Sequence, residues 1–148
     1  MEDYMKERPK KTVFPESRQK KILEKAKKFV LVDLLPNPKI NKIVLFGSLV
    51  EGKFGEYEKP FKDRKYSDVD VLLMVEENFE VPNQWGEHFH CEMYDVYNAH
   101  MMDEILVQYM VCRKSQYQNE KYQEESEKWG VPLSLDESKH KNMVIYEK

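Results

Sequence analysis

Two short apolar runs in the middle of the chain constrain its fold more than any other feature. The first, KIVLFGS, extends from Lys42 to Ser48, and the second, DVDVLLMV, extends from Asp68 to Val75. Each run has apolar side chains at consecutive positions, so both of its faces are apolar, which is typical of a buried strand. The two runs predict the centre of a small mixed β-sheet in an α/β (α+β) fold.

Patterns of helical period flank these strands. Residues 16 to 35 place their apolar side chains on one face of a helix, and Pro36 ends it. From Asp103 onward the apolar spacing again predicts a helix, with Asp103 as its N-cap. Residues 113 to 129 are mostly polar and predict a solvated helical extension. The expected fold therefore has helices packed on one side of the sheet and a C-terminal helix.

The remaining segments complete one domain, which we expect to span residues 16 to 148. Residues 1 to 15 are polar and contain two prolines, which predicts a flexible N-terminal arm. Residues 49 to 67 predict a short helix and then a loop. The aromatic run from residue 88 to residue 100 predicts a third strand, and the closing segment NMVIYEK predicts a last one.

Charge and composition exclude several classes of protein. Lys and Arg number 24 against 27 Asp and Glu, and the net charge of −3 gives no global argument for binding nucleic acid or a membrane. The first residues lack an apolar signal segment, and no apolar run is long enough to span a bilayer. The two cysteines, Cys91 and Cys112, lack a CxxC spacing. We therefore expect a reduced, cytoplasmic location.

Asp68 and Asp70 open the second apolar run, where carboxylates are unusual. Side chains two residues apart on a strand project to the same face, with Cα atoms roughly 7 Å apart. Two carboxylates this close repel each other, and a cation resolves the repulsion. Hard oxygen ligands of this kind suit Mg²⁺ or Mn²⁺. The pair alone leaves open an alternative, an exposed strand end whose acids meet water or lysines.

Gly47 and Ser48 directly follow the first strand. A glycine there lets a ligand approach the backbone closely, and the first N–H groups of a following helix favour an anion. A serine hydroxyl adds a donor for a phosphate oxygen. An ordinary strand-to-helix turn is the alternative for this pair. The order of strand, Gly-Ser, helix, paired acids and strand is more specific, because one element holds a phosphate and the other holds a metal.

The run LFGSLVEGK, followed by SDVDVLLMV, resembles the signature of the minimal nucleotidyltransferases of the DNA polymerase beta superfamily. The matching residues are Gly47, Ser48, Gly52, Ser67, Asp68 and Asp70. The resemblance implies a nucleotidyltransferase-type sheet, an NTP substrate and two Mg²⁺ ions held by the acids. It implies transfer of a nucleoside monophosphate to an acceptor hydroxyl with release of pyrophosphate. Gly47, Ser48 and Ser67 would then bind the NTP.

The family's third carboxylate lies on the next strand, between hydrophobic residues, and the segment MYDVY offers Asp95 for this role. Glu92 competes with it. Residues three positions apart on a strand point to opposite faces, so only one of the two can face the metals. Asp95 is the favoured candidate for metal binding, and it would also take the acceptor's proton.

Two departures from the family pattern concern charge and length. Relatives often have an arginine just before the next glycine, whereas this chain has Val50 and Glu51, and Lys53 is the candidate replacement. Residues 53 to 66 form an insertion on the active-site side that is positive on balance. This insertion is either a lid that helps hold the triphosphate or a solvated loop.

The motifs do not specify the acceptor, which the family leaves open as protein, RNA or small molecule. Some relatives act as antitoxins that add a nucleotide to a toxin. Little chain remains to build an acceptor pocket, and the apolar side chains of Met101, Met102 and Ile105 suit an interface, so we expect a helical protein partner or a homo-oligomer. The rival interpretation is a non-catalytic binding module that keeps the fold and acts through a partner.

Overall fold

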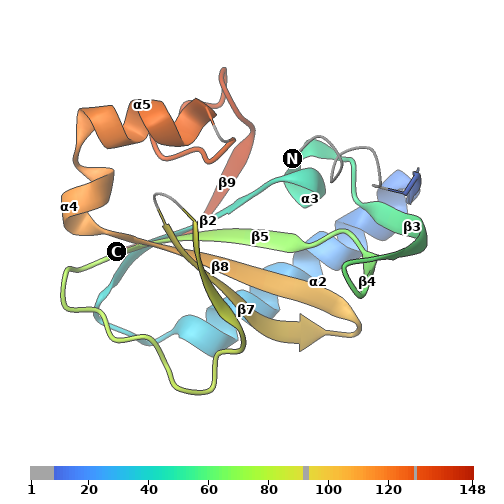
Figure 1. Cartoon of the computed structure of the whole chain (residues 1–148), viewed down its shortest axis with the longest axis horizontal. Coiled ribbons are helices and arrows are strands. Elements are labelled where there is room, and N and C mark those ends of the chain that lie inside the picture. The colour runs from blue at the N-terminus through green and yellow to red at the C-terminus, as the bar shows by residue number, and fades with distance from the viewer. Residues whose placement is uncertain (1–8, 92–93, 129) are drawn as a thin grey trace.

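The computed structural model describes residues 9 to 91, 94 to 128 and 130 to 148, and its fold is mixed α+β (Figure 1). The main element is a six-stranded sheet with the strand order β6–β7–β8–β5–β2–β9. Its strands are β2 (Ile40–Phe46), β5 (Val69–Val75), β6 (His88–Cys91), β7 (Tyr94–Met102), β8 (Ile105–Arg113) and β9 (Asn142–Glu147). β5 and β8 run parallel, and the other neighbouring pairs are antiparallel, so the sheet is mixed as predicted.

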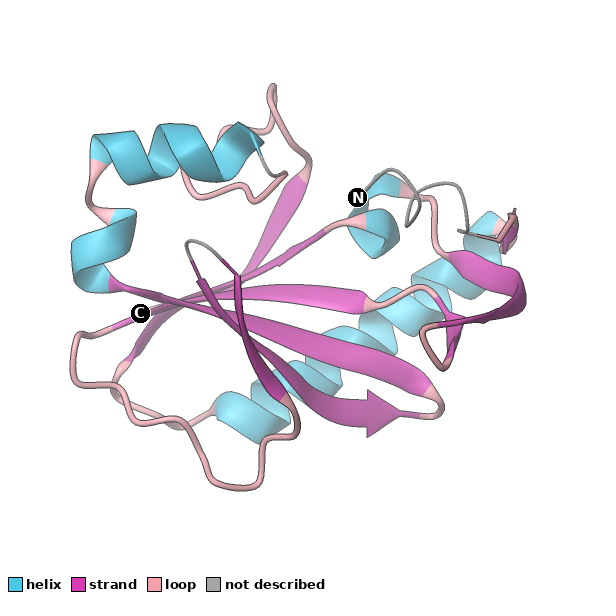
Figure 2. Cartoon of the chain, viewed as in Figure 1, coloured by secondary structure: helices cyan, strands magenta, loops and turns pink. Residues whose placement is uncertain are grey.

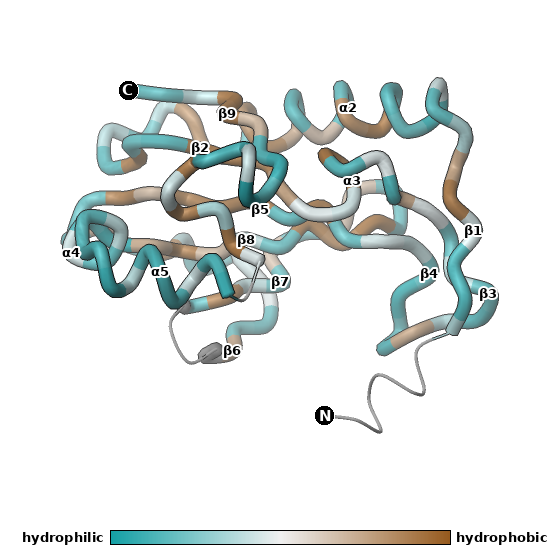
Figure 3. Tube along the Cα trace, turned by 90° about the horizontal axis from the view of Figure 1, so that it is seen from above, coloured by the Kyte–Doolittle hydropathy of each residue, from teal (hydrophilic) through white to brown (hydrophobic). Residues whose placement is uncertain are grey.

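The two apolar runs form β2 and β5, which pair with each other in the interior of the sheet. Ile43 lies opposite Leu73, and Phe46 lies opposite Asp70. Consecutive residues of β5, such as Leu72 and Leu73, are fully buried although they point to opposite faces. Figure 3 shows hydrophobic residues along these strands and hydrophilic ones along α5. The prediction of two buried strands is therefore confirmed.

Helices cover both faces of this sheet. The helix α2 (Glu16–Leu34) lies on one face, and α4 (Lys114–Tyr117) and α5 (Glu120–Lys128) lie over the other (Figure 3). Ala26 of α2 is completely buried in the first face's core, whereas Tyr117 and Tyr122 pack against the second. The prediction of helices on one side only is wrong. The helical extension predicted for residues 113 to 129 does form α4 and α5, and its polar composition hid the few side chains that face the sheet.

The helix predicted from Asp103 onward is wrong, because β8 occupies that segment (Figure 2). Asp103 and Glu104 form a tight turn between β7 and β8, with φ values of 46° and 69°, and neither caps a helix. β8 packs against a core on each face, so its apolar residues stand at nearly every position. Such a run satisfies helical spacing by chance, and periodicity alone cannot separate the two states.

A second, three-stranded sheet replaces the predicted loop and part of the predicted arm. It contains β1 (Lys11–Val13), β3 (Gly55–Phe61) and β4 (Arg64–Tyr66) in the order β1–β3–β4. Residues 62 and 63 join β3 to β4 in left-handed conformations typical of a tight hairpin turn. The insertion of residues 53 to 66 is thus largely a hairpin, and we refer to residues 55 to 66 as the β3–β4 hairpin.

The predicted arm of residues 1 to 15 is wrong for its second half, because β1 pairs with β3 and Phe14 enters the core. A Cβ atom on Gly55 would lie 2.1 Å from the carbonyl oxygen of Thr12. Only glycine allows the two strands to approach this closely. Pairing with the hairpin therefore fixes the residues that precede α2, a contact that local composition does not reveal. Residues 1 to 8 lie outside the described part of the chain.

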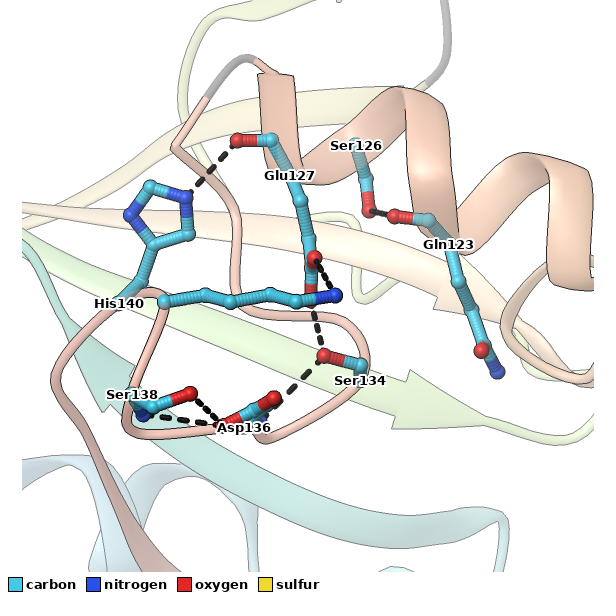
Figure 4. A network of polar contacts seen from close by, with 8 residues as sticks. Gln123, Ser126, Glu127, Ser134, Asp136, Ser138 and His140 are labelled. Carbon is cyan, nitrogen blue, oxygen red and sulfur yellow. Dashed lines mark hydrogen bonds and ion pairs between the residues drawn. The ribbon is translucent and has the colours of Figure 1, made fainter.

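A polar network holds the connection between α5 and β9 (Figure 4). The carboxylate of Glu127 accepts a hydrogen bond from the Ser134 hydroxyl and forms an ion pair with Lys139 at 3.0 Å. His140 Nε2 donates to the backbone carbonyl of Glu127 at 2.8 Å. The network folds residues 130 to 141 back onto the helix and delivers the chain to β9, the strand predicted for the C-terminal segment.

Asp33 fastens α2 to the sheet. Its Oδ2 atom accepts a hydrogen bond from the Tyr109 hydroxyl at 2.8 Å and from His100 Nε2 at 3.0 Å. Tyr109 is fully buried on β8, and both burial and the bond to Asp33 raise the pKa of its hydroxyl. In the described part of the chain, none of the helices combines the length and the apolar character that crossing a bilayer requires.

Replacing Asp33 with alanine should lower the free energy of unfolding by about 2–3 kcal/mol, because the buried Tyr109 hydroxyl loses its acceptor. Urea denaturation followed by circular dichroism measures this loss. The exposed ion pair of Lys25 with Asp103 provides the control, and Lys25→Ala should cost less than about 1 kcal/mol. Equal losses in the two variants would show that Asp33 is no more than a surface acid.

Replacing Glu127 with glutamine should destabilise the protein at neutral pH by about 1 kcal/mol. The Ser134 hydroxyl, followed by Lys139, lowers the pKa of Glu127, so its contribution to stability is present above its ordinary value of 4.5 and is lost as the pH falls through the folded value. Thermal unfolding of Glu127→Gln should therefore match the wild type near pH 3. The neighbouring exposed Glu125 provides the control, and Glu125→Gln should show little difference at either pH.

Candidate functional site

The end of β2 and the start of β5 bring the Gly-Ser turn and the paired acids together. Phe46, the last residue of β2, pairs with Asp70 across the antiparallel ladder. Gly47 follows with a φ of +78°, and a Cβ atom added there would lie 2.3 Å from Asp70 Oδ2. Any other residue would be strained and would collide with the carboxylate. The backbone of the turn and the acid are therefore in direct contact.

A single helical turn, α3 (Ser48–Glu51), begins at this contact and ends at Gly52, whose φ is +75°. The backbone N–H of Lys53 donates to the Ser48 carbonyl at 2.8 Å, while the Lys53 side chain is exposed. Two of the predicted phosphate-binding residues, Gly47 and Ser48, thus lie beside the acids. Lys53 lies on the surface just after the turn.

Ser67, also a predicted phosphate-binding residue, is buried and engaged elsewhere. Its Oγ atom accepts from the backbone N–H of Gly55 at 3.1 Å and donates to the Gly55 carbonyl at 3.4 Å. Its backbone N–H donates to the same carbonyl at 3.0 Å. Ser67, which directly precedes Asp68, therefore links the acids to the start of β3. Its hydroxyl is bonded to the backbone of Gly55 and not to a ligand.

A cation from the β3–β4 hairpin reaches the acids. Arg64 Nη1 donates to Asp68 Oδ2 at 2.6 Å, and the two side chains are only 23% and 18% exposed. The same guanidinium acts on Asp70 and favours its charged form. The sequence does not single out Arg64 among the cations of the insertion, because its approach to Asp68 depends on the hairpin that carries it.

Asp70 has a strongly perturbed acidity. Burial, and then the neighbouring Asp68 carboxylate, raises the pKa of Asp70 to about 8. Glu51 acts in the same direction, whereas Arg64 and Lys11 oppose it. Negative charge thus outweighs positive charge around this carboxylate. A bound divalent cation would relieve the imbalance and favour the ionised acid.

Asp95 does not lie with the other two acids. It pairs with Val111 of β8, which is level with Leu73 of β5, three residues beyond Asp70. Leu73 and Val111 belong to the core beneath α2, so Asp95 stands on the opposite face of the sheet from Asp70. Its Oδ1 atom lies 3.0 Å from His88 Nε2. The structure therefore does not support Asp95 as the third metal ligand.

Amides occupy the positions level with Asp70 on the next two strands. Gln108 of β8 pairs with Asp70, and Asn98 of β7 pairs with Gln108. Gln108 Nε2 donates to Asn98 Oδ1 at 3.0 Å. Sequence reasoning misses both amides because it predicts a helix for β8, and the lone glutamine inside ILVQYMVC is the available signal. Glu92, the other candidate for the third carboxylate, lies outside the described residues.

The oxygen atoms of this site define the ligand class that it can hold. Among the residues that the structure describes, no group of three His, Cys, Asp or Glu side chains forms a metal cluster. Asp68 and Asp70 are the two carboxylates that meet at this turn in the described residues, and Gln108 is in register with Asp70. Mg²⁺ commonly binds through one or two carboxylates and completes its shell with water and phosphate oxygens.

Comparison with known proteins leaves the family open. No protein-family model matches the chain, and no curated protein matches its sequence. The contact of the Gly-Ser turn with the acids, and the charges around them, are therefore the features that bear on function.

The raised pKa of Asp70 predicts that stability falls with rising pH. The folded protein keeps this proton up to about pH 8, whereas the unfolded chain releases it near pH 3.8. Stability from this group is thus complete below pH 3.8 and is lost as the pH rises through 8. In metal-free buffer, Asp70→Asn should exceed the wild type in stability by on the order of 5 kcal/mol at pH 9 and match it near pH 3.5.

Thermal denaturation across this pH range measures the difference. Asp63→Asn is the matched control, because Asp63 is exposed in the hairpin turn, where its left-handed conformation also suits asparagine. Parallel pH profiles for Asp70→Asn and the wild type would contradict the perturbed acidity of Asp70.

Proposed function

We propose that the chain is a metal-dependent nucleotidyltransferase, which moves a nucleoside monophosphate from an NTP to an acceptor hydroxyl and releases pyrophosphate. The observation that carries this proposal is the contact between Gly47 and Asp70. It joins a backbone turn that is open to a phosphate with a carboxylate pair suited to a metal. An ordinary strand-to-helix turn has no need of a glycine pressed against a half-buried acid.

The residues present fit Mg²⁺ or Mn²⁺ by ligand type. Asp68 and Asp70 project from the same face of the chain at the start of β5, and the surplus of negative charge around Asp70 favours a cation there. The bound ion supplies Lewis-acid polarisation of the phosphate and neutralises developing charge. The sequence resemblance implies two such ions, and the two carboxylates are their protein ligands.

The chain's own residues bind and orient the triphosphate. The backbone at Gly47 leaves room for the phosphates, and the Ser48 hydroxyl donates to one of their oxygens. Arg64, which bonds to Asp68 in the structure, adds positive charge beside the acids. Lys53 adds positive charge from the surface. Positioning and electrostatic stabilisation supply most of the rate in phosphoryl transfer, and these contacts are of both types.

A second candidate function is nucleotide binding without transfer. Two observations favour it, namely the place of Asp95 on the far face of the sheet and the amide of Gln108 level with Asp70. An amide cannot take a proton from an acceptor hydroxyl at neutral pH, whereas a carboxylate can. A protein of this kind would bind Mg·NTP and act through a partner.

The test measures Mg·NTP binding by thermal shift and pyrophosphate release with each of the four NTPs. Asp68→Asn and Asp70→Asn should each reduce pyrophosphate release by at least about a hundredfold while the protein stays folded, because a metal ligand is lost. Asp103→Asn makes the same change of charge in an exposed turn and should leave both readouts unchanged.

The two readouts separate the candidates. Binding of Mg·NTP that depends on both acids, without pyrophosphate release under any acceptor mixture, would favour the binding module. Binding that survives in both acid variants would exclude this site from either function.

A further inference from the structure

A cavity of about 510 Å³ lies at the β3–β4 hairpin, whose Arg64 also reaches Asp68. Its lining comes from the turn of the β3–β4 hairpin, from the β6–β7 region and from the start of β8. Arg64 lines the cavity and also bonds to Asp68, so the cavity and the acids share a side chain. A volume of this size suits a small ligand of nucleotide dimensions.

The cavity and the acids lie on the same face of the sheet. Asn98, which lines the cavity, is level with Gln108, and Gln108 is level with Asp70. Neighbouring strands are about 4.8 Å apart, so Asn98 lies two strands and roughly 10 Å from Asp70. The Gly-Ser turn lies on the other side of Asp70, on β2. The acids therefore stand between the turn and the cavity.

Exposed apolar side chains mark this cavity. Phe89 is 40% exposed and Met101 is 59% exposed, and both line it together with Leu106. Large apolar residues gathered at a cavity in this way typically contact a ligand. An aromatic ring and a thioether offer flat, polarisable surface to a planar ring.

Polar groups surround the apolar part of the lining. The amide of Asn98 suits the edge of a base, and the ammonium group of Lys62 suits a phosphate. Asp63 and Glu87 also line the cavity, and their carboxylates accept hydrogen bonds from hydroxyl or amino groups. A ligand with a flat ring, a phosphate and sugar hydroxyls would match all of these groups, and a nucleoside phosphate has all three.

We propose that this cavity binds the acceptor of the transfer and that the acceptor is a nucleoside phosphate, either free or at the end of an RNA. This inference rests on the proposed function. In an in-line displacement the acceptor enters opposite the leaving pyrophosphate. The triphosphate lies toward Gly47 and Ser48, so the acceptor approaches from the β7–β8 side, where the cavity is. This chain then builds its own acceptor pocket, whether or not a partner also binds.

The step forms one bond and breaks one bond. An acceptor hydroxyl oxygen bonds to the α-phosphorus of the NTP, and the bond from that phosphorus to the bridging oxygen breaks. The electron pair of the broken bond leaves with pyrophosphate, and the hydroxyl proton passes to water. No oxidant or reductant takes part.

The test measures binding of AMP, GMP, CMP and UMP by calorimetry, without NTP or metal. Phe89→Ala should weaken the tightest of these complexes about tenfold, because base stacking is lost. Val144→Ala is the matched control, since Val144 is also 40% exposed but lies on β9 away from the cavity, and it should leave the Kd unchanged. Ribose 5-phosphate, which lacks the base, should bind at least tenfold more weakly than the nucleotide.

Further arms identify the source of the ligand and its site. A short oligoribonucleotide that binds more tightly than its terminal mononucleotide, and loses affinity in Phe89→Ala, would identify an RNA end as the source. Absence of binding by both ligands, or affinity that survives in Phe89→Ala, would overturn the proposal. Affinity lost in Asp70→Asn but kept in Phe89→Ala would place the ligand at the acids and would also overturn it.

The transfer itself provides the final arm. With labelled NTP and Mg²⁺, Phe89→Ala should lose labelled acceptor product while its Mg·NTP thermal shift stays equal to that of the wild type. Equal product in the two proteins would contradict an acceptor role for the cavity. A wild type that shows no Mg·NTP shift would defeat the proposed function instead, and the metal-free calorimetry would still report on the cavity.

Discussion

The pairing of β2 with β5 is the constraint on which the rest of the structure depends. These strands are buried on both faces, so their register decides which side chains enter each core. A shift of one residue would move every side chain of one strand to the other face. The same register sets Phe46 opposite Asp70, and this pairing is what presses the following glycine against the carboxylate. One ladder of hydrogen bonds therefore specifies both the packing and the site.

One face of the sheet packs against the long helix, whereas the other carries the candidate site. On the α2 face, apolar packing and the bonds of Asp33 to Tyr109 and His100 fasten a long helix. On the other face the apolar core beneath α4 and α5 gives way, toward the start of β5, to polar side chains. Asp70, Gln108 and Asn98 form a row across three strands there. All three side chains are partly exposed, so this row offers polar groups to a ligand.

The sequence predicts those parts of the fold whose signal is local. The buried strands, the first helix and the Gly-Ser turn beside the acids all follow from short patterns. The prediction for β8 is wrong because burial on both faces removes the alternation of apolar and polar residues that marks a strand. The same error hides Gln108. β1 and the β3–β4 hairpin are not predicted because β1 pairs with a strand that is remote in sequence. The approach of Arg64 to Asp68 depends on this hairpin, so it is not predicted either. The prediction of Asp95 as a metal ligand is not supported, because the face of the sheet to which a strand residue points is known only once its register with β8 is known.

The parallel pairing of β5 with β8 also determines when, during folding, the amides of β8 and β7 come to lie beside the acids. β5 follows β2 after one hairpin, so the contact of Gly47 with Asp70 is available to a chain that ends at β5. β8 can join β5 only after residues 76 to 104, which include β6 and β7, have been synthesised and have crossed over. Contacts between segments remote in sequence close later, because a longer loop must lose its freedom. A nascent chain therefore possesses its paired acids before it possesses the amides and the cavity beside them.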